Sequence, residues 1–418
     1  MTAIYFLVPK NWQNWVLLSG NFVFLGTWGP LPFAMIATSI AVHFWSCQCM
    51  IRSAKPKRWV GGALGFQILV LVFFKSQSGK GSPLPLGISY YSLMLIGLTL
   101  DIYWKRTNFN FKFWKFATAA TFFPILTMGP IEKLQHFIAQ LESPRPLRGE
   151  NLQQGFYLIL LGLFKLTAIS NVLSQVIDHQ SSLALHVSGV GLLLYCILAF
   201  LLLYTDFSGF IDLVSGISTI LGFRVARNFR QPYLSTGFAD IWKRWHISLT
   251  LWLRDYLYLP LMLKTKNFYL SALVILILTG AWHGMTLEYL YWTLYWLFVF
   301  LLFHFLPKSK IKFLNWVLTL TAISLSTLCF MIPFSGFKEL ILRLFDFSSP
   351  GLALLFAHPF LESWKGAILF LAISLMVIFE TFDEQNPKAL FTLKIMTLSF
   401  LIALLGRFES STLLYMHF

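Results

Sequence analysis

Long apolar runs constrain the fold of this 418-residue chain more than any other feature. A membrane-spanning helix needs about 20 mostly apolar residues. The clearest runs that approach or reach this length are 59–74, 155–172, 187–205, 268–282, 286–306, 313–334, 366–379 and 390–406. Backbone in lipid must satisfy its own hydrogen bonds, so such runs favour helices, whereas a barrel would show short alternating segments.

The composition supports the same conclusion. Hydrophobic residues make up 57% of the chain and charged residues only 12%, against about 25% charged residues in soluble domains. We therefore predict an all-α polytopic membrane protein with about 10–13 membrane helices, some of them re-entrant or interfacial. We expect one integral-membrane domain over 1–418, in which the polar loop 142–151 separates a helical group at 1–141 from a second group at 152–418, which carries the candidate site.

The formal net charge of +15 comes largely from cations in short loops. The positive-inside rule explains many of them and indicates that these loops are cytoplasmic. A second interpretation adds a basic cytoplasmic mouth that attracts an anionic donor. Nucleic-acid binding is not expected, because no compact polar domain could present a basic face. The four cysteines lie in or near apolar segments, and no metal site is predicted.

The segment Trp-Lys-Arg-Trp-His-Ile-Ser-Leu-Thr at 242–250 contains the first candidate site residue, His246. Trp242, Trp245, His246 and Leu249 fall at i, i+3, i+4 and i+7, which predicts a helix with these side chains on one face. Asp240 and Arg244 have the spacing of an ion pair on a neighbouring face. Pro260 is expected to end or kink the segment.

A second histidine, His283, follows an apolar run in the sequence Thr-Gly-Ala-Trp-His-Gly. Histidines are rare in membrane segments and often mark functional sites. A lone histidine is more often a satisfied core residue, but two Trp-His pairs indicate one buried site that handles protons. Gly280 and Gly284 bracket His283 and would let the helix open there. An imidazole could activate a hydroxyl for attack on a thioester, and nearby donors would stabilise the oxyanion.

Two acidic residues, Asp206 and Asp212, close a long apolar helix and therefore need partners. The arginines that follow in the sequence, at 224, 227 and 230, are the expected partners. We interpret both aspartates as members of a structural ion-pair network rather than as catalytic groups.

The segment 238–260, from Phe-Ala-Asp-Ile-Trp to Tyr-Leu-Pro, closely resembles the signature of the membrane-bound O-acyltransferases, in the bacterial branch that contains alginate O-acetylation and teichoic acid D-alanylation proteins. Gly-Ala-Trp-His-Gly at 280–284 resembles the second histidine motif of that family. Further similar segments are 85–91, 123–130, 206–210, 228–235 and 414–418. One departure is Trp292-Thr-Leu-Tyr-Trp296, where relatives tend to show Trp-Gly and then His-Gly.

The resemblance implies a many-helix fold around a central tunnel. His283 matches the principal catalytic histidine and would be the general base toward the acceptor hydroxyl, and His246 matches the second histidine. The tryptophans that would line the tunnel are Trp242, Trp245 and Trp282. Further candidates for substrate contacts in the matching segments are Arg244, Asn228, Asp206 and Arg254.

The resemblance also implies an enzyme of the bacterial cytoplasmic membrane with no bound cofactor. The acyl group, acetyl in the leading hypothesis, would come from acetyl-CoA or an acylated carrier protein. It would pass to an extracytoplasmic polysaccharide or to an SGNH-type accessory acyltransferase. One alternative is D-alanyl transfer from a carrier protein toward teichoic acid. Another is an acyl or lipid transporter without catalysis, although the chain lacks the internal symmetry typical of transporters.

Overall fold

The computed structural model describes residues 2–77, 87–143, 145–177, 187–306, 309–331, 336–347, 361, 364–385 and 391–407. Its regular elements in these ranges are α-helices, short π-helical segments and one 3-10 turn, without a strand. This confirms the predicted all-α fold. Residues 85 and 86 of the similar segment 85–91, and the similar segment 414–418, lie outside the described residues.

Six described helices are long and apolar enough to cross a membrane. They are Pro30–Arg52, Pro56–Ser76, Gly149–Val176, Gly189–Ile220, Leu287–Phe305 and Trp364–Asp383. Three shorter apolar helices are Ile88–Tyr103, Phe268–His283 and Phe391–Leu405. Together with the composition, these helices make the chain a multi-pass membrane protein.

The chain forms two compact units, each assembled from separate stretches of sequence. The first unit comprises Met1–Phe156, Val214–Arg227 and Ser248–Phe268, and the second comprises Tyr157–Leu213, Asn228–Ile247 and Tyr269–Phe418. The units therefore interleave along the chain. The predicted single domain, divided at 142–151, stays a prediction.

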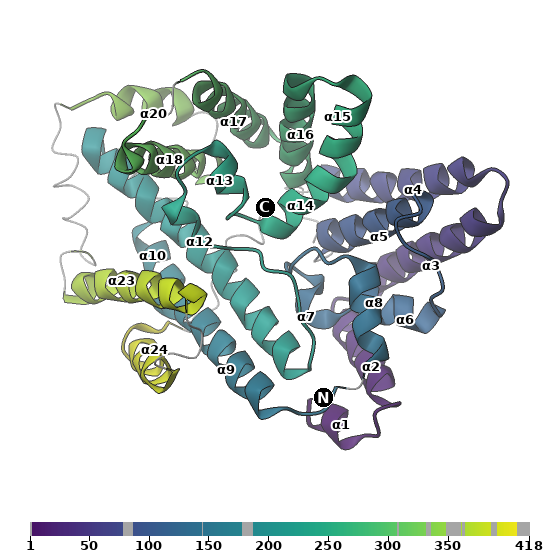
Figure 1. The fold of residues 1–418 in the computed structure, drawn as a ribbon. Coiled ribbons are helices and arrows are strands. Elements are labelled where there is room, and N and C mark those ends of the chain that lie inside the picture. The colour runs from purple at the N-terminus through teal and green to yellow at the C-terminus, as the bar shows by residue number, and fades with distance from the viewer. Residues whose placement is uncertain are drawn as a thin grey trace. The chain divides into compact units, whose positions relative to one another are not determined.

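Buried polar contacts join the helices of the first unit. Its helices are α1 (Thr2–Leu7), α2 (Gln13–Gly26), α3 (Pro30–Arg52), α4 (Pro56–Gln77), α5 (Ile88–Tyr103), α6 (Phe113–Ala120), α7 (Phe123–Leu126), α8 (Leu134–Glu142), α14 (Ile247–Leu253), η3 (Arg254–Tyr258) and α15 (Leu259–Thr265). In the layer formed by α3, α4 and α5 (Figure 1), His43 Nδ1 lies 2.7 Å from Thr99 Oγ1, and the Gln67 amide donates to Ser92 Oγ. Such contacts tie membrane helices together where water is absent.

The apolar segment 122–130 is broken in the structure, as its prolines and glycine predict. Only the four residues of α7 are helical there, and Pro124, Ile125 and Leu126 are buried in protein. Irregular backbone at membrane depth is tolerated in such surroundings. Gly87, at φ +74°, packs so closely that a Cβ would lie 1.9 Å from the Leu126 carbonyl oxygen.

The chain does not end its helix at Pro260. The helices α14 and α15 are joined through η3, a π-helical segment at Arg254–Tyr258, and Pro260 is the second residue of α15. A π-helical turn relieves the conflict between the proline ring and the preceding turn, because it alters the local hydrogen-bond register.

The second unit is built around α12 (Gly189–Ile220), a 32-residue helix whose end, from Val214 on, belongs to the first unit. Its other elements are α9 (Gly149–Leu163), which begins in the first unit, η1 (Phe164–Ser170), α10 (Asn171–Val176), η2 (Pro232–Leu234), α13 (Phe238–Trp242), α16 (Phe268–His283), α17 (Leu287–Phe305), α18 (Lys312–Ser326), α19 (Leu328–Met331), α20 (Phe337–Leu344), α23 (Trp364–Gln385) and α24 (Phe391–Leu405). The helices α9 and α12 run side by side (Figure 1), because Gly162 and Gly209 let their backbones approach closely.

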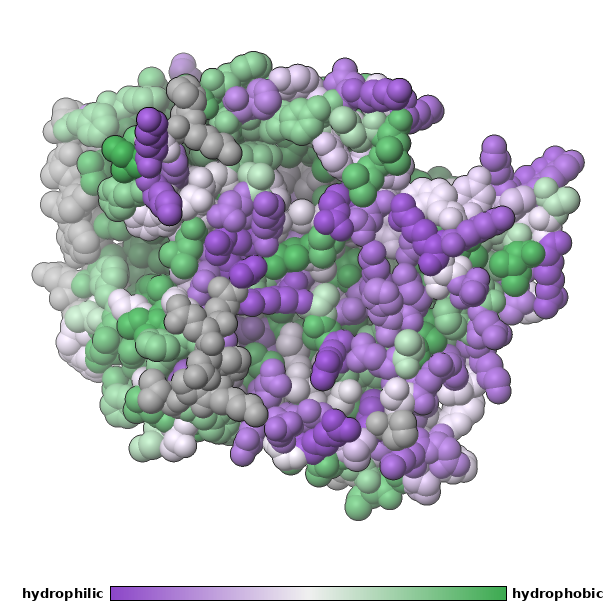
Figure 2. All heavy atoms as spheres, in the orientation of Figure 1, coloured by the Kyte–Doolittle hydropathy of each residue, from purple (hydrophilic) through white to green (hydrophobic). Residues whose placement is uncertain are grey.

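Helix α17 is hydrophobic all round, which is typical of a helix between protein and lipid. Its inner face buries Trp292, Trp296 and Phe300, whereas its outer face exposes large apolar side chains. The exposed residues are Leu287, Leu290, Leu294, Phe298, Leu301, Leu302 and Phe305. On the face drawn in Figure 2, patches of exposed hydrophobic residues lie among many hydrophilic ones.

Candidate functional site

The segment that carries His246 is a turn and not part of a continuous helix. Helix α13 ends at Trp242 and α14 begins at Ile247, so the helix predicted through Leu249 is wrong at 243–246. His246 itself has φ +42°, a left-handed conformation that is uncommon for this residue type. Such a conformation persists only where the surroundings hold it.

The extended segment at 228–230 holds this turn through its backbone. The Ile247 N–H donates to the Asn228 carbonyl over 2.9 Å, and the Arg230 N–H donates to the Arg244 carbonyl over 2.9 Å. These two bonds flank His246 and explain why the helical periodicity does not continue. Asn228, a candidate for substrate contact, thus has a backbone role in shaping the site.

His246 is buried among aromatic rings, with 2% of its surface exposed. Its imidazole meets the ring of Phe207 on α12 edge to face at a centroid distance of 5.1 Å. It also meets the indole of Trp282 at 6.1 Å. Burial lowers the pKa of His246 to about 3, so the imidazole is neutral at physiological pH.

His283 is the last residue of α16 and is half-buried. Its ring stacks parallel to Tyr289 at a centroid distance of 6.1 Å and meets Trp292 edge to face at 5.3 Å. Close packing explains the flanking glycines: a Cβ at Gly280 would lie 1.9 Å from Thr293 Oγ1, and one at Gly284 would lie 2.2 Å from the Tyr289 ring. The glycines therefore bring α17 against the histidine.

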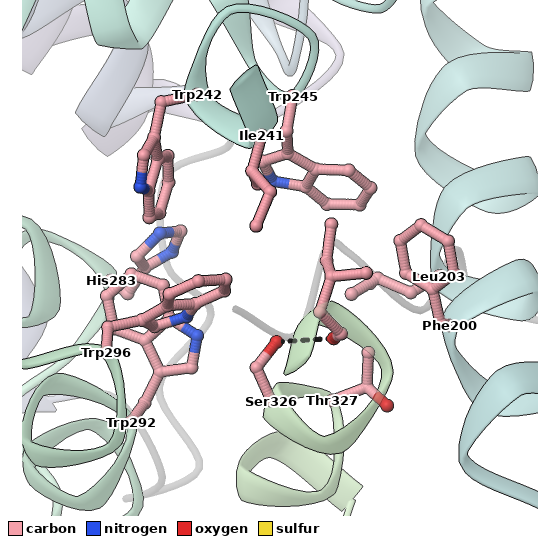
Figure 3. A pocket seen from close by; sticks show the side chains of 11 residues that line it. Phe200, Leu203, Ile241, Trp242, Trp245, His283, Trp292, Trp296, Ser326 and Thr327 are labelled. Carbon is pink, nitrogen blue, oxygen red and sulfur yellow. Dashed lines mark hydrogen bonds between the residues drawn. The ribbon is translucent and has the colours of Figure 1, made fainter. Parts of the chain in front are cut away.

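A cavity of about 40 Å³ lies beside His283 (Figure 3). Trp242 and Trp245 line it, and so do Trp292 and Trp296 of α17. The other lining residues in the described part of the chain are Phe200, Leu203, Ile241, Ile323, Ser326 and Thr327. This volume holds water-sized groups, whereas whole ligands need several hundred Å³.

His246 and Trp282 are not among the described residues that line this cavity. The prediction that His246, Trp242 and Trp245 share one face is therefore wrong, because the turn at 243–246 separates them. Trp282 connects the two histidines instead, since its ring contacts His246 at 6.1 Å and His283 at 4.9 Å. Trp292 and Trp296 lie in a segment that departs from the family pattern, but their i, i+4 spacing indicates a shared helix face.

A buried ionic cluster anchors the wall formed by Trp245. Lys165 Nζ lies 2.6 Å from Asp212 Oδ2 and 2.5 Å from Glu380 Oε1. Tyr204 and Tyr233 both donate to the Glu380 carboxylate, at 2.7 and 2.6 Å. The Tyr204 ring in turn contacts the indole of Trp245 at a centroid distance of 6.5 Å.

The cluster confirms that Asp212 belongs to a structural ion-pair network. Lys165 supplies a cation to this network, and the pairing with the arginines expected from the sequence stays a prediction. Lys165 and Glu380 are 215 residues apart in the sequence, so no short sequence pattern could predict that they pair. Asp206 is buried nearby on α12, where Ser170 Oγ lies 3.5 Å from its Oδ1 atom.

The two candidate arginines are held in ion pairs. Arg244 pairs with Asp240 over 3.0 Å, as the i, i+4 spacing predicts. Arg254 belongs to the first unit and pairs with Asp255 over 2.8 Å, where Lys133 also contacts that carboxylate. Burial would raise the pKa of Asp255, but the two cations outweigh it and hold the pKa below its usual value.

Comparison with known proteins places these features in context. A family model described as "MBOAT, membrane-bound O-acyltransferase family" matches residues 110–335, which is more than half of the chain and includes both histidines. The chain is 29% identical over 319 residues to a protein named probable alginate O-acetylase AlgI from Pseudomonas putida, covering 69% of this chain and 65% of that protein.

Two further relatives carry different names. A peptidoglycan O-acetyltransferase from Helicobacter pylori is 27% identical, covering 50% of this chain and 46% of that protein. A teichoic acid D-alanyltransferase from Bacillus subtilis is 25% identical, covering 54% of this chain and 61% of that protein. The match thus spans less than two thirds of the length of each of these relatives.

Proposed function

Because this chain belongs to the membrane-bound O-acyltransferase family, we propose that it is an enzyme that transfers an acyl group to a hydroxyl. The acyl group is acetyl, and the acceptor is an extracytoplasmic polysaccharide or an SGNH-type accessory acyltransferase. The observation that carries the proposal is the position of His283, half-buried beside a cavity walled by four tryptophans. The names of the acetylase relatives support the choice of acetyl.

His283 acts as the general base in this proposal. Its imidazole takes the proton of the acceptor hydroxyl while the hydroxyl oxygen attacks the thioester carbonyl carbon. The donor is acetyl-CoA or an acylated carrier protein, which serves as a co-substrate. When the tetrahedral intermediate collapses, the imidazolium returns the proton to the departing thiolate. The aromatic walls exclude water, which would otherwise hydrolyse the thioester.

The neutral His246 has a supporting role. With its pKa lowered to about 3 by burial, His246 is a poor proton acceptor at physiological pH. It contacts Trp282, which contacts His283. His246 therefore fixes the position of the Trp282 ring, which lies next to the proposed base His283. This agrees with the match of His246 to the second histidine of the family.

The proposed location is the bacterial cytoplasmic membrane, where the chain would bring a cytoplasmic donor and an extracytoplasmic acceptor together. The six apolar helices of sufficient length support this proposal. Separation of inner and outer membranes from cells that produce the tagged protein tests it. Recovery in the outer membrane fraction would contradict it.

His283→Ala tests the catalytic assignment. We expect it to abolish ester-linked acetate on the envelope polysaccharide while the protein stays folded in the membrane. Acetate released by mild alkali from whole envelopes measures this. The matched control is His136→Ala, an exposed histidine on α8, which should retain wild-type acetylation. Wild-type ester levels in the His283 variant would overturn the assignment.

D-alanyl is the alternative to acetyl as the transferred group, because some relatives are named teichoic acid D-alanyltransferase. In that case, the same histidine would serve a D-alanyl thioester carried by a protein, toward teichoic acid. Identification of the acid released by mild alkali distinguishes the two, because acetate supports the first proposal and D-alanine supports the second.

A further inference from the structure

The indole N–H of Trp296 is a buried donor at the cavity beside His283. Trp296 has 2% of its surface exposed and lines the cavity. Its Nε1 atom is buried, and nothing in the described part of the chain accepts a hydrogen bond from it. Among the described residues that line the cavity, only Trp296 has a buried side-chain donor without a hydrogen-bond acceptor.

The packing around Trp296 fixes the ring in place. Its indole contacts Trp242 at a centroid distance of 5.1 Å, Phe238 at 5.9 Å and Tyr295 at 5.8 Å. The neighbouring Trp292 lies at 6.2 Å and touches His283 in turn. A donor held this firmly is preorganised, because it needs no rearrangement when negative charge develops beside it.

The hydroxyl groups across the cavity do not compete for this role. Ser326 Oγ donates to the Ile323 carbonyl over 2.7 Å, and Thr327 Oγ1 donates to the Ser324 carbonyl over 2.6 Å. Figure 3 shows both side chains at the wall of the cavity, with the first of these bonds drawn. Since their protons are already used, they offer the cavity mainly lone pairs.

We propose that Trp296 Nε1–H donates a hydrogen bond to the acyl carbonyl oxygen as that oxygen becomes an oxyanion. Trp296 is therefore a catalytic residue, and this inference rests on the proposed acyl transfer. A carbonyl oxygen supplies the acceptor that the buried N–H lacks within the chain. The bond strengthens as charge develops, so it stabilises the transition state more than the bound thioester.

The chemical step balances without further reactants. The acceptor oxygen forms a bond to the carbonyl carbon and gives its proton to His283, and the carbonyl electron pair moves onto the oxygen that faces Trp296. This electron pair then re-forms the carbonyl and the carbon–sulfur bond breaks. The departing thiolate takes the proton from His283. The products are an ester and a free thiol.

Replacement of Trp296 by 3-benzothienylalanine tests the inference, because this residue keeps the size and shape of tryptophan but carries sulfur in place of N–H. With the full-length protein in membranes and acetyl thioester as donor, we expect kcat to fall on the order of 10²–10³-fold with KM nearly unchanged, as for loss of one oxyanion donor. Trp296→Phe should lose at least as much kcat. The thermal unfolding temperature of the benzothienylalanine protein should match that of wild type.

The matched control places benzothienylalanine at Trp364, which is 60% exposed on α23, and should leave kcat unchanged. A kcat within twofold of wild type at position 296, or a change confined to KM, would overturn the inference. A different result would contradict the proposed function, namely equal acyl transfer by the wild-type protein and by His283→Ala. If His283→Ala is inactive and the benzothienylalanine protein is normal, only the role of Trp296 is refuted.

Discussion

The imidazole of His246 meets the indole of Trp282 edge to face, with ring centroids 6.1 Å apart. The same indole contacts His283 at 4.9 Å. One aromatic ring therefore joins the two histidines, although only His283 belongs to the described lining of the cavity. A substitution at His246 would therefore affect the position of His283 through the Trp282 ring.

Loss of the Trp282 ring should impair catalysis. In Trp282→Ala the side chain that contacts His283 is missing, so the base is free to shift, and a displacement of about 1 Å can cost on the order of 10²-fold in rate. We expect a fall in kcat of this order, measured as acyl transfer by membranes. Trp282→Phe, which keeps an aromatic ring, should recover most of the rate. Equal activities of the Phe and Ala variants would contradict a positioning role.

His246 should make the protein less stable in acid. Its pKa is about 3 in the folded chain and about 6.5 when exposed. Between these values, the unfolded chain binds a proton that the folded chain does not. The stabilisation is complete above pH 6.5 and is lost as pH falls toward 3, at about 1.4 kcal/mol per pH unit. Unfolding of the detergent-solubilised protein between pH 7.5 and 5 measures this slope.

The variant His246→Gln provides the comparison. Its unfolding free energy should fall less steeply as the pH decreases. The two slopes should differ by about the uptake of one proton on unfolding. Parallel slopes for the two proteins would mean that His246 is protonated in the folded chain, against the expected effect of its burial.

Lys165→Met should destabilise the second unit strongly. The change removes the cation that faces Asp212 and Glu380, and breaking a buried ion pair typically costs about 3–5 kcal/mol. Chemical or thermal unfolding of the solubilised protein provides the measurement. The control is Lys115→Met, which removes a pair with the exposed Glu142 and should cost about 1 kcal/mol or less. Similar losses in both variants would show that burial does not set the energy of the cluster.

Gly280→Ala should disturb the contact between α16 and α17. The new methyl group would lie 1.9 Å from Thr293 Oγ1, so either the Thr293 side chain must turn away or the helices must separate. We expect a loss of about 1–3 kcal/mol in stability, as for overpacked cores, together with reduced acyl transfer. Gly61→Ala is the matched control on α4, since a Cβ there meets nothing within 4 Å. A Gly280 variant as stable and active as this control would refute the close packing.

The sequence predicted the helical membrane fold and the family, because each depends on local composition or on a short motif. The turn at His246 was not predictable from periodicity. The stripe from Trp242 to Leu249 has helical spacing, but tertiary hydrogen bonds from Asn228 and Arg230 break the helix. Local pattern and tertiary contact conflict at this point, which is common at functional sites.

The walls of the cavity were predictable only in part. Trp242 and Trp245 belong to the recognised motif, whereas Trp292 and Trp296 come from a segment that departs from it. The ionic cluster at Lys165 joins helices that are distant in the sequence, so no spacing rule could pair its members. An aspartate in an apolar segment needs a partner, as Asp212 does, but the sequence alone does not select which cation pairs with it.

Lys165 lies in the π-helical segment Phe164–Ser170. A π-helical turn holds one residue more than an α-helical turn, and one residue corresponds to about 100° of rotation about the helix axis. Deleting a single residue within this segment would therefore restore the α-helix and rotate Lys165 away relative to the residues that follow. The insertion or loss of one codon can thus introduce or remove an intramembrane charge pair while every other amino acid stays the same.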